Sequence, residues 1–117
     1  MTLAEFFYAC GGSYAEAASR FMTDARMLKY INKFEAGTDI EALKRAVASK
    51  TSEEAFRQAH TLKGVCLNLC FGNLAHAASE LCELYRGNDP EVDPAPYLDA
   101  VLKEYDRVLG LIADLNG

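Results

Sequence analysis

The chain lacks the features that mark secretion, membrane insertion and nucleotide binding. No apolar run approaches the roughly 18 residues that a membrane-spanning helix needs, and the N-terminal stretch MTLAEFFYACGG carries no basic residue before its apolar part. Neither Gly-x-x-x-x-Gly-Lys-Ser/Thr nor Gly-x-Gly-x-x-Gly occurs, and the length leaves no room for an ATP-binding domain. We therefore predict a cytoplasmic protein with no membrane-spanning segment and no autonomous ATP-dependent kinase activity.

An excess of positive charge is also absent. The 117 residues carry a net charge of −5, which argues against nucleic acid or an anionic membrane surface as the main partner. Half of the residues are apolar and a quarter are charged, as in soluble globular proteins. A chain of this length is expected to form one domain.

Proline is scarce, and no segment alternates apolar and polar residues as a strand would. Apolar residues instead recur at helical spacing, which predicts an all-α fold: an antiparallel four-helix bundle with short N-terminal capping helices. We expect one domain over residues 1–117, with cap helices in 1–23 and the bundle in 24–117. The expected helices are 2–9, 14–21, 24–49 (two helices or one helix kinked at Gly37), 52–71, Asn73 to about Arg86, and one beginning near Pro94.

Ser/Thr-x-x-Glu boxes mark the expected helix starts, since each side chain of such a box can bond the other residue's free backbone N–H. Four such boxes occur, at Thr2/Glu5, Ser13/Glu16, Thr38/Glu41 and Thr51/Glu54. Gly87 is the expected C-cap of the helix that runs to about Arg86, and Asp93 is expected to cap the last helix.

The chain has no Cys-x-x-Cys pair, although it has four cysteines: Cys10, Cys66, Cys70 and Cys82. Without an export signal, reduced and buried thiols are expected rather than disulfides. A metal site built from Cys66, Cys70, Cys82 and His76 is a less favoured alternative, because His76 lies off the apolar face of its helix. We therefore expect no metal; zinc retained by the purified protein would reverse that expectation.

The stretch Ala59-His60-Thr61-Leu62-Lys63-Gly64 is the best candidate for chemistry. On a helix, His60 falls at the edge of the apolar stripe, with Lys63 and Gly64 one turn further on. A glycine inside a helix costs about 1 kcal/mol relative to alanine, so close approach of another molecule is a reason to have one. An imidazole nitrogen is a nucleophile near neutral pH, and an ammonium beside it favours an anion. The pattern indicates a phosphoryl acceptor; a purely structural histidine is the alternative.

The hexapeptide, continued as Val65-Cys66-Leu67-Asn68-Leu69, resembles the signature of histidine-containing phosphotransfer (HPt) domains. The resemblance implies a four-helix bundle that carries a phosphoryl group between receiver-domain aspartates in a multistep phosphorelay. It implies that His60 is phosphorylated, that Lys63 stabilises the phosphoryl group and that Gly64 admits the receiver. Partner contacts are expected at four further positions: Arg57, Leu67, Asn68 and Phe71.

The same resemblance implies the partners. They are response-regulator receiver domains, a hybrid histidine kinase, or both, and the chain is expected to act on them as a monomer. It needs no cofactor of its own, because the Mg²⁺ used in transfer is expected on the receiver.

Three positions depart from the family pattern. HPt domains usually have small residues, often glycine, seven and ten positions after the histidine, where this chain has Leu67 and Cys70. Many members carry Gln or Glu 22 positions after it, where Cys82 stands here. These departures motivate a second interpretation, a non-phosphorylated HPt-like protein-binding module.

Overall fold

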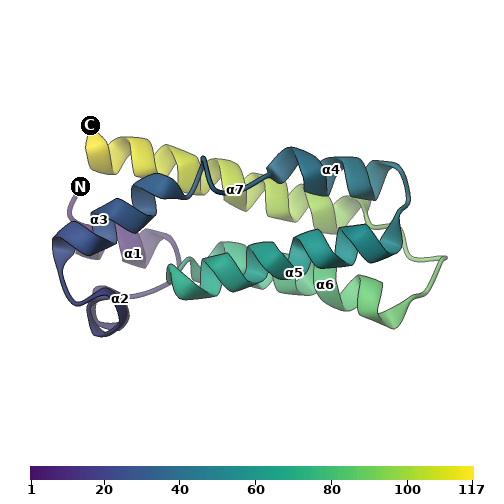
Figure 1. Ribbon diagram of the computed structural model, residues 1–117, viewed down its shortest axis with the longest axis horizontal. Coiled ribbons are helices and arrows are strands. Elements are labelled where there is room, and N and C mark those ends of the chain that lie inside the picture. Colours follow the sequence, from purple (N-terminus) through teal and green to yellow (C-terminus); the bar gives the residue numbers. More distant parts are fainter.

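Seven helices and no strand make up the chain in the computed structural model, which describes all 117 residues (Figure 1). The all-α prediction is therefore confirmed. None of these helices is both long and apolar enough to cross a membrane. The helices are α1 (Leu3–Ala9), α2 (Tyr14–Phe21), α3 (Asp24–Lys33), α4 (Ile40–Ala48), α5 (Ser52–Asn68), α6 (Gly72–Gly87) and α7 (Ala95–Asn116).

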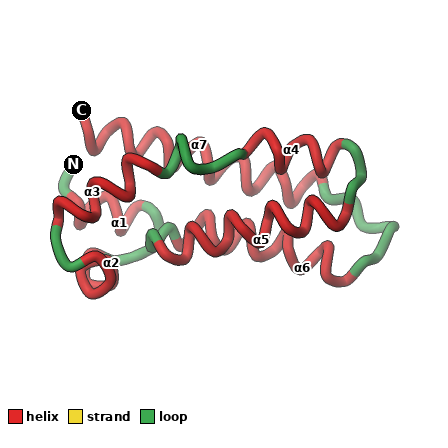
Figure 2. The backbone as a smooth tube through the Cα atoms, in the orientation of Figure 1, coloured by secondary structure: helices red, strands yellow, loops and turns green.

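Helices α4 to α7 form the bundle. Helix α5 lies against both α4 and α6, while α7 packs along α6 and closes the ring by touching α4 (Figure 1). The α4–α5 and α6–α7 connections lie together at one end of the molecule (Figure 2). Residues 34–39 separate α3 from α4, so the expected 24–49 segment is two helices.

Helices α1, α2 and α3 gather at the opposite end, where both chain termini also lie (Figures 1 and 2). Helix α1 contacts α2 and α7, and α2 contacts α3. The side chains of Phe6 and Phe7 in α1 are 0% exposed. The N-terminal helices thus contribute to the core instead of merely lying on it.

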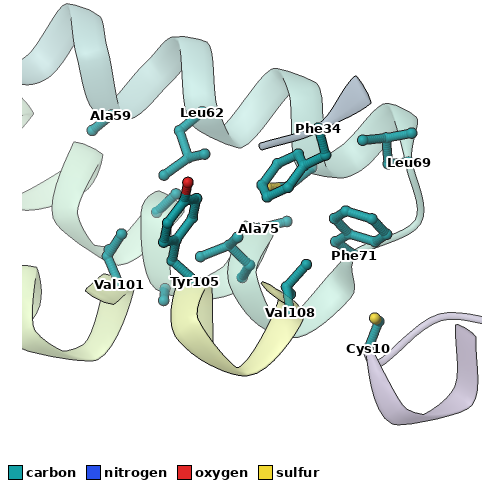
Figure 3. Packing of buried hydrophobic residues seen from close by; sticks show 14 of the residues in the cluster. Cys10, Phe34, Ala59, Leu62, Leu69, Phe71, Ala75, Val101, Tyr105 and Val108 are labelled. Carbon is teal, nitrogen blue, oxygen red and sulfur yellow. The ribbon is translucent and has the colours of Figure 1, made fainter. Parts of the chain in front are cut away.

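Three aromatic side chains from distant parts of the chain meet in this part of the core, and Figure 3 shows two of them, Phe34 and Phe71. The Phe71 ring centroid lies 5.1 Å from that of Phe34 and 5.8 Å from that of Phe6, both in edge-to-face geometry. Phe71 is 0% exposed. The expectation that Phe71 contacts a partner is wrong, because α5 ends at Asn68, short of the predicted 71, and the turn that follows directs Phe71 inward.

That turn joins α5 to α6 through a Schellman motif. The Phe71 N–H donates to the Cys66 carbonyl at 2.9 Å and the Cys70 N–H donates to the Leu67 carbonyl at 3.3 Å. Cys70 is the residue in the left-handed region, with φ 61°, a conformation that glycine adopts at less cost. Cys70 is therefore held in a backbone conformation that favours glycine.

The Gly11-Gly12 segment packs directly against the turn. A Cβ on Gly12 would lie 2.3 Å from the Cys70 carbonyl oxygen, and one on Gly72 would lie 2.3 Å from that of Gly11. The Asn73 N–H donates to the Cys10 carbonyl at 2.9 Å. Only glycine permits this backbone approach, which fastens the cap to the α5–α6 corner.

One of the four predicted capping boxes forms in full, and a second forms only its Ser13 side-chain bond. The Thr2 hydroxyl accepts from the Glu5 N–H at 3.1 Å, and the Glu5 carboxylate accepts from the Thr2 N–H at 2.8 Å. The Ser13 hydroxyl accepts from the Glu16 N–H at 3.1 Å. These two starts were predictable because the capping contacts are local.

The other two boxes are wrong in detail. Asp39, and not Thr38, caps α4 by accepting from the Ala42 N–H at 3.0 Å. Thr51 precedes α5 as predicted but makes no side-chain cap bond. The Thr23 hydroxyl caps α3, a start that the box pattern missed because its third residue is Arg26 and not an acid.

The ends of the long loop are close to those predicted. Gly87 is the last residue of α6, and the left-handed cap is Asn88, with φ 52°. The Asp93 carboxylate accepts from the Ala95 N–H at 3.0 Å, but the N-cap residue of α7 is Pro94, one residue after the predicted cap.

Candidate functional site

His60 lies in the middle of α5, on the side that faces solvent. Its neighbours Ala59 and Leu62 are buried against the rest of the bundle, and they fix which side of the helix His60 occupies. The imidazole is exposed, further toward solvent than the edge of the core predicted from the spacing. Another molecule can therefore reach it without any change in the bundle.

The His60 ring stacks on Phe56, one turn earlier on α5. Their ring centroids are 5.8 Å apart and their planes differ by 13°. From the neighbouring helix α6, the Arg86 guanidinium carbon lies 5.7 Å from the Phe56 centroid. The Arg86 Nε lies 3.4 Å from a Glu83 carboxylate oxygen. Neither Phe56 nor Arg86 was predicted from the sequence; only Phe56, four residues before His60, had a local signal.

Cys82 stands where many HPt domains have an amide or acid, and it does not reach the surface. Its side chain is 0% exposed. Burial raises the pKa of the Cys82 thiol, while the charges of Lys63 and Arg86 act in the opposite direction. Cys82 is therefore buried, and the His60 ring has its aromatic contact with Phe56 instead.

Lys63 and Gly64 follow His60 by one helical turn. Lys63 is half-buried. Gly64 is exposed, and a Cβ built there would meet nothing within 4 Å. The fold itself therefore does not require glycine at this position.

Three of the four predicted partner residues are on the surface of α5. Arg57 is exposed and pairs with Glu54, whose pKa is lowered by hydrogen bonds from Gln58 and then Arg57. Leu67 is 52% exposed, a large apolar side chain open to solvent, and Asn68 is exposed beside it. The fourth, Phe71, belongs to the core.

The cysteines and His76 do not form a cluster. All four cysteines are free and buried, and no group of three His, Cys, Asp or Glu side chains is placed to hold a metal ion. His76 is exposed on α6, with its Nε2 3.6 Å from a Glu80 oxygen. The metal-site alternative thus gains no support from the geometry.

The fold and the site together define a class: a helical bundle that displays a histidine on the solvent face of a central helix. Comparison with protein families assigns this chain within that class. The model of the Hpt domain matches residues 33–110, a range that contains α4, α5, α6 and the site, so the chain belongs to the Hpt domain family. Comparisons with curated proteins and with solved structures give no match. Family membership indicates a role in phosphorelay histidine phosphotransfer, in which Hpt domains interact with receiver domains and histidine kinases.

Proposed function

We propose that the chain is a phosphohistidine carrier of a multistep phosphorelay. His60 accepts a phosphoryl group from the aspartate of one receiver domain and passes it to the aspartate of another. The observation that carries this proposal is the exposed His60 imidazole in the middle of α5, with Lys63 and the open position at Gly64 one turn away. Membership of the Hpt domain family supports it.

The transfer step is a displacement at phosphorus. An imidazole nitrogen of His60 attacks the phosphorus of the receiver's acyl phosphate and forms an N–P bond. The O–P bond breaks, and its electron pair leaves with the receiver aspartate as a carboxylate. The return step is the reverse, with the carboxylate of a second receiver as nucleophile, so no net oxidation, reduction or ATP hydrolysis occurs.

Lys63 and Gly64 assist this step in different ways. The Lys63 ammonium offsets the negative charge of the phosphoryl oxygens. This stabilisation is strongest when the docked receiver has excluded water. The missing side chain at Gly64 lets the receiver bring its aspartate close to the imidazole. Arg57, Leu67 and Asn68 lie on the exposed side of the same helix and contact the docked receiver.

The partners are response-regulator receiver domains, a hybrid histidine kinase, or both. The chain supplies the histidine and the charge of Lys63, and the Mg²⁺ of the transfer reaction is held by the receiver. The carrier therefore works without a cofactor of its own and takes its phosphoryl group from another phosphoprotein rather than from ATP.

The experiment is incubation with a receiver phosphorylated on aspartate, followed by analysis of the label. We expect acid-labile, alkali-stable label on the wild-type chain and none on the His60→Ala variant. The chain has only two histidines, so His76→Ala is a matched control: it removes an exposed histidine of α6 and should label like wild type. Equal labelling of His60→Ala and wild type would refute the assignment.

The second candidate, a protein-binding module that is not phosphorylated, is favoured by one observation: the exposed Leu67, an apolar contact that needs no chemistry. The same variants separate the two. A module binds receivers equally well with and without His60 and never acquires label. A carrier acquires label on His60. That result identifies a carrier even if the His60→Ala variant still binds the receiver.

A further inference from the structure

We infer that Phe56 is a positioning residue for His60, and that Arg86 holds Phe56 in place from the neighbouring helix. This inference rests on the proposed phosphotransfer and assigns the orientation of its nucleophile. The contacts form a continuous series from α6 to α5: Glu83 to Arg86, Arg86 to Phe56, and Phe56 to His60.

The stacked geometry suits a nucleophilic imidazole. The Phe56 and His60 planes differ by only 13°, so the phenyl ring lies along one face of the imidazole. The nitrogen lone pair points outward in the plane of the ring, not toward either face. Phe56 therefore limits rotation of the imidazole while it leaves the reacting edge open to a phosphoryl group.

Phe56 is itself fixed by α6. It is half-buried, with the Arg86 guanidinium 5.7 Å from its centroid. Glu83 holds Arg86 at 3.4 Å, one turn earlier on α6. Without the contact from Arg86, the half-buried Phe56 side chain would sample several rotamers, and its stack on His60 would be intermittent.

This series of contacts orients the His60 imidazole. Position 82 carries a cysteine and therefore has no amide or acid that could orient it by a hydrogen bond. That thiol is 0% exposed. Helix α6 still orients the His60 imidazole, through Arg86, which lies four residues after Cys82. The contact with His60 is made by the aromatic ring of Phe56 instead of by a hydrogen bond. The imidazole keeps both nitrogens free of partners from its own chain.

The test combines two measurements on the full chain. The first is the ¹H chemical shift of the His60 ring protons, which the ring current of a stacked phenyl moves upfield. The second is the rate of His60 phosphorylation by phosphoramidate, a donor small enough to need no docking surface. In that reaction the His60 nitrogen forms an N–P bond, the donor's P–N bond breaks, and ammonia leaves with its electron pair.

We expect Phe56→Leu to return the His60 shifts toward those of an unstacked histidine and to slow phosphorylation roughly fivefold, because a misoriented nucleophile attacks less often. Phe56→Tyr retains the ring and should restore both measurements to near the wild-type values. Arg86→Gln should give intermediate values of both. Phe21→Leu is the matched control, since Phe21 also stacks on an aromatic ring, that of Tyr30, but in the cap.

Unchanged shifts and rates in Phe56→Leu, with wild type phosphorylated, would overturn this inference and leave the proposed function standing. A wild-type chain that acquires no phosphoryl group from either donor would overturn both. A rate that falls only in parallel with the unfolding midpoint, with His60 shifts unmoved, would show Phe56 to be a packing residue and would also overturn the inference.

Discussion

The Arg20 guanidinium of α2 lies at the C-terminus of α5, with its Nη1 2.5 Å from the Leu67 carbonyl oxygen. The same nitrogen lies 2.9 Å from the Asn68 carbonyl oxygen and 3.8 Å from the Cys70 sulfur. Both carbonyls belong to the last turn of α5, where the Leu67 carbonyl also accepts from the Cys70 N–H, and a cation there complements the helix dipole. The helix that carries His60 is thus closed by a residue of the cap.

Replacement of Arg20 by Gln should destabilise the protein. The two carbonyls would lose a charged donor, and we expect the free energy of unfolding to fall by about 1–2 kcal/mol. Urea titration followed by circular dichroism measures it. Arg26→Gln is the matched control, because Arg26 is an exposed cation of α3 whose side chain makes no ion pair. Equal stability of the two variants would mean that Arg20 does not act as a cap.

At Cys70, glycine should be more stable than alanine. Both variants lack the thiol, and only glycine adopts φ 61° without strain. The free energy of unfolding of Cys70→Gly should therefore exceed that of Cys70→Ala by about 1 kcal/mol. Cys66 provides a control of opposite sign. Cys66 is inside α5, where the alanine variant should be more stable than the glycine variant by a similar amount. The same order at both positions would contradict the left-handed assignment.

Substitution of Gly64 should separate stability from transfer. Because a Cβ at Gly64 meets open space, Gly64→Ala should stabilise the helix by about 0.5–1 kcal/mol. It should nevertheless slow transfer from a phosphorylated receiver, by roughly tenfold, since the added methyl group lies in the path of the partner. Gly110→Ala in α7 is the control: its Cβ also meets nothing within 4 Å, and it should stabilise without slowing transfer.

Removal of the charge at Lys63 should slow transfer and leave the helix intact. We expect Lys63→Ala to lower the transfer rate roughly tenfold, because a cation that stabilises the transferring group is lost. Lys103→Ala removes an exposed cation from α7 and should have no effect on the rate. Unchanged transfer in Lys63→Ala would show Lys63 to be a solvated surface residue.

Stability should decrease in alkaline solution. Burial raises the pKa of the Cys10 and Cys66 thiols from 9.0 to about 12, so the folded protein keeps protons that the unfolded chain releases. Unfolding is then favoured increasingly between about pH 9 and pH 12, and this contribution to stability is fully present below pH 9.

Urea midpoints at pH 8, 9, 10 and 11 measure the decrease. The double variant Cys10→Ala/Cys66→Ala should show a smaller decrease with pH, whatever its absolute stability. Some decrease should remain, since burial also raises the pKa values of Tyr85 and Tyr105. A double variant with the wild-type pH dependence would show that the two thiols do not contribute.

Much of the architecture followed from local patterns. Helix order, the break near Gly37 and the burial of the cysteines depend on apolar spacing and on residues that stop helices, which act over a few positions. The placement of His60, Lys63 and Gly64 together on α5 followed from the same periodicity. Such features were predictable because neighbours in sequence determine them.

Contacts between distant residues were not predictable in this way. Arg20 and Leu67 are 47 residues apart, and nothing in either neighbourhood indicates the bond. Phe71 was misplaced because the helical pattern continues past Asn68, whereas the chain turns there and Phe71 packs on Phe6 and Phe34. Arg86 depends on the way α6 lies beside α5, which the spacing within one helix does not contain.

The contact of Gly11-Gly12 with the α5–α6 turn determines the shortest fragment of this protein that is expected to fold on its own. The family match begins at residue 33, but Phe6 and Phe7 lie before it and are fully buried. An expression fragment trimmed to that boundary would leave Phe71 with an open side and the Cys70 turn without its neighbour. Aggregation of such a fragment would reflect this exposed apolar surface, so laboratory truncations should begin no later than Thr2, the residue that caps α1.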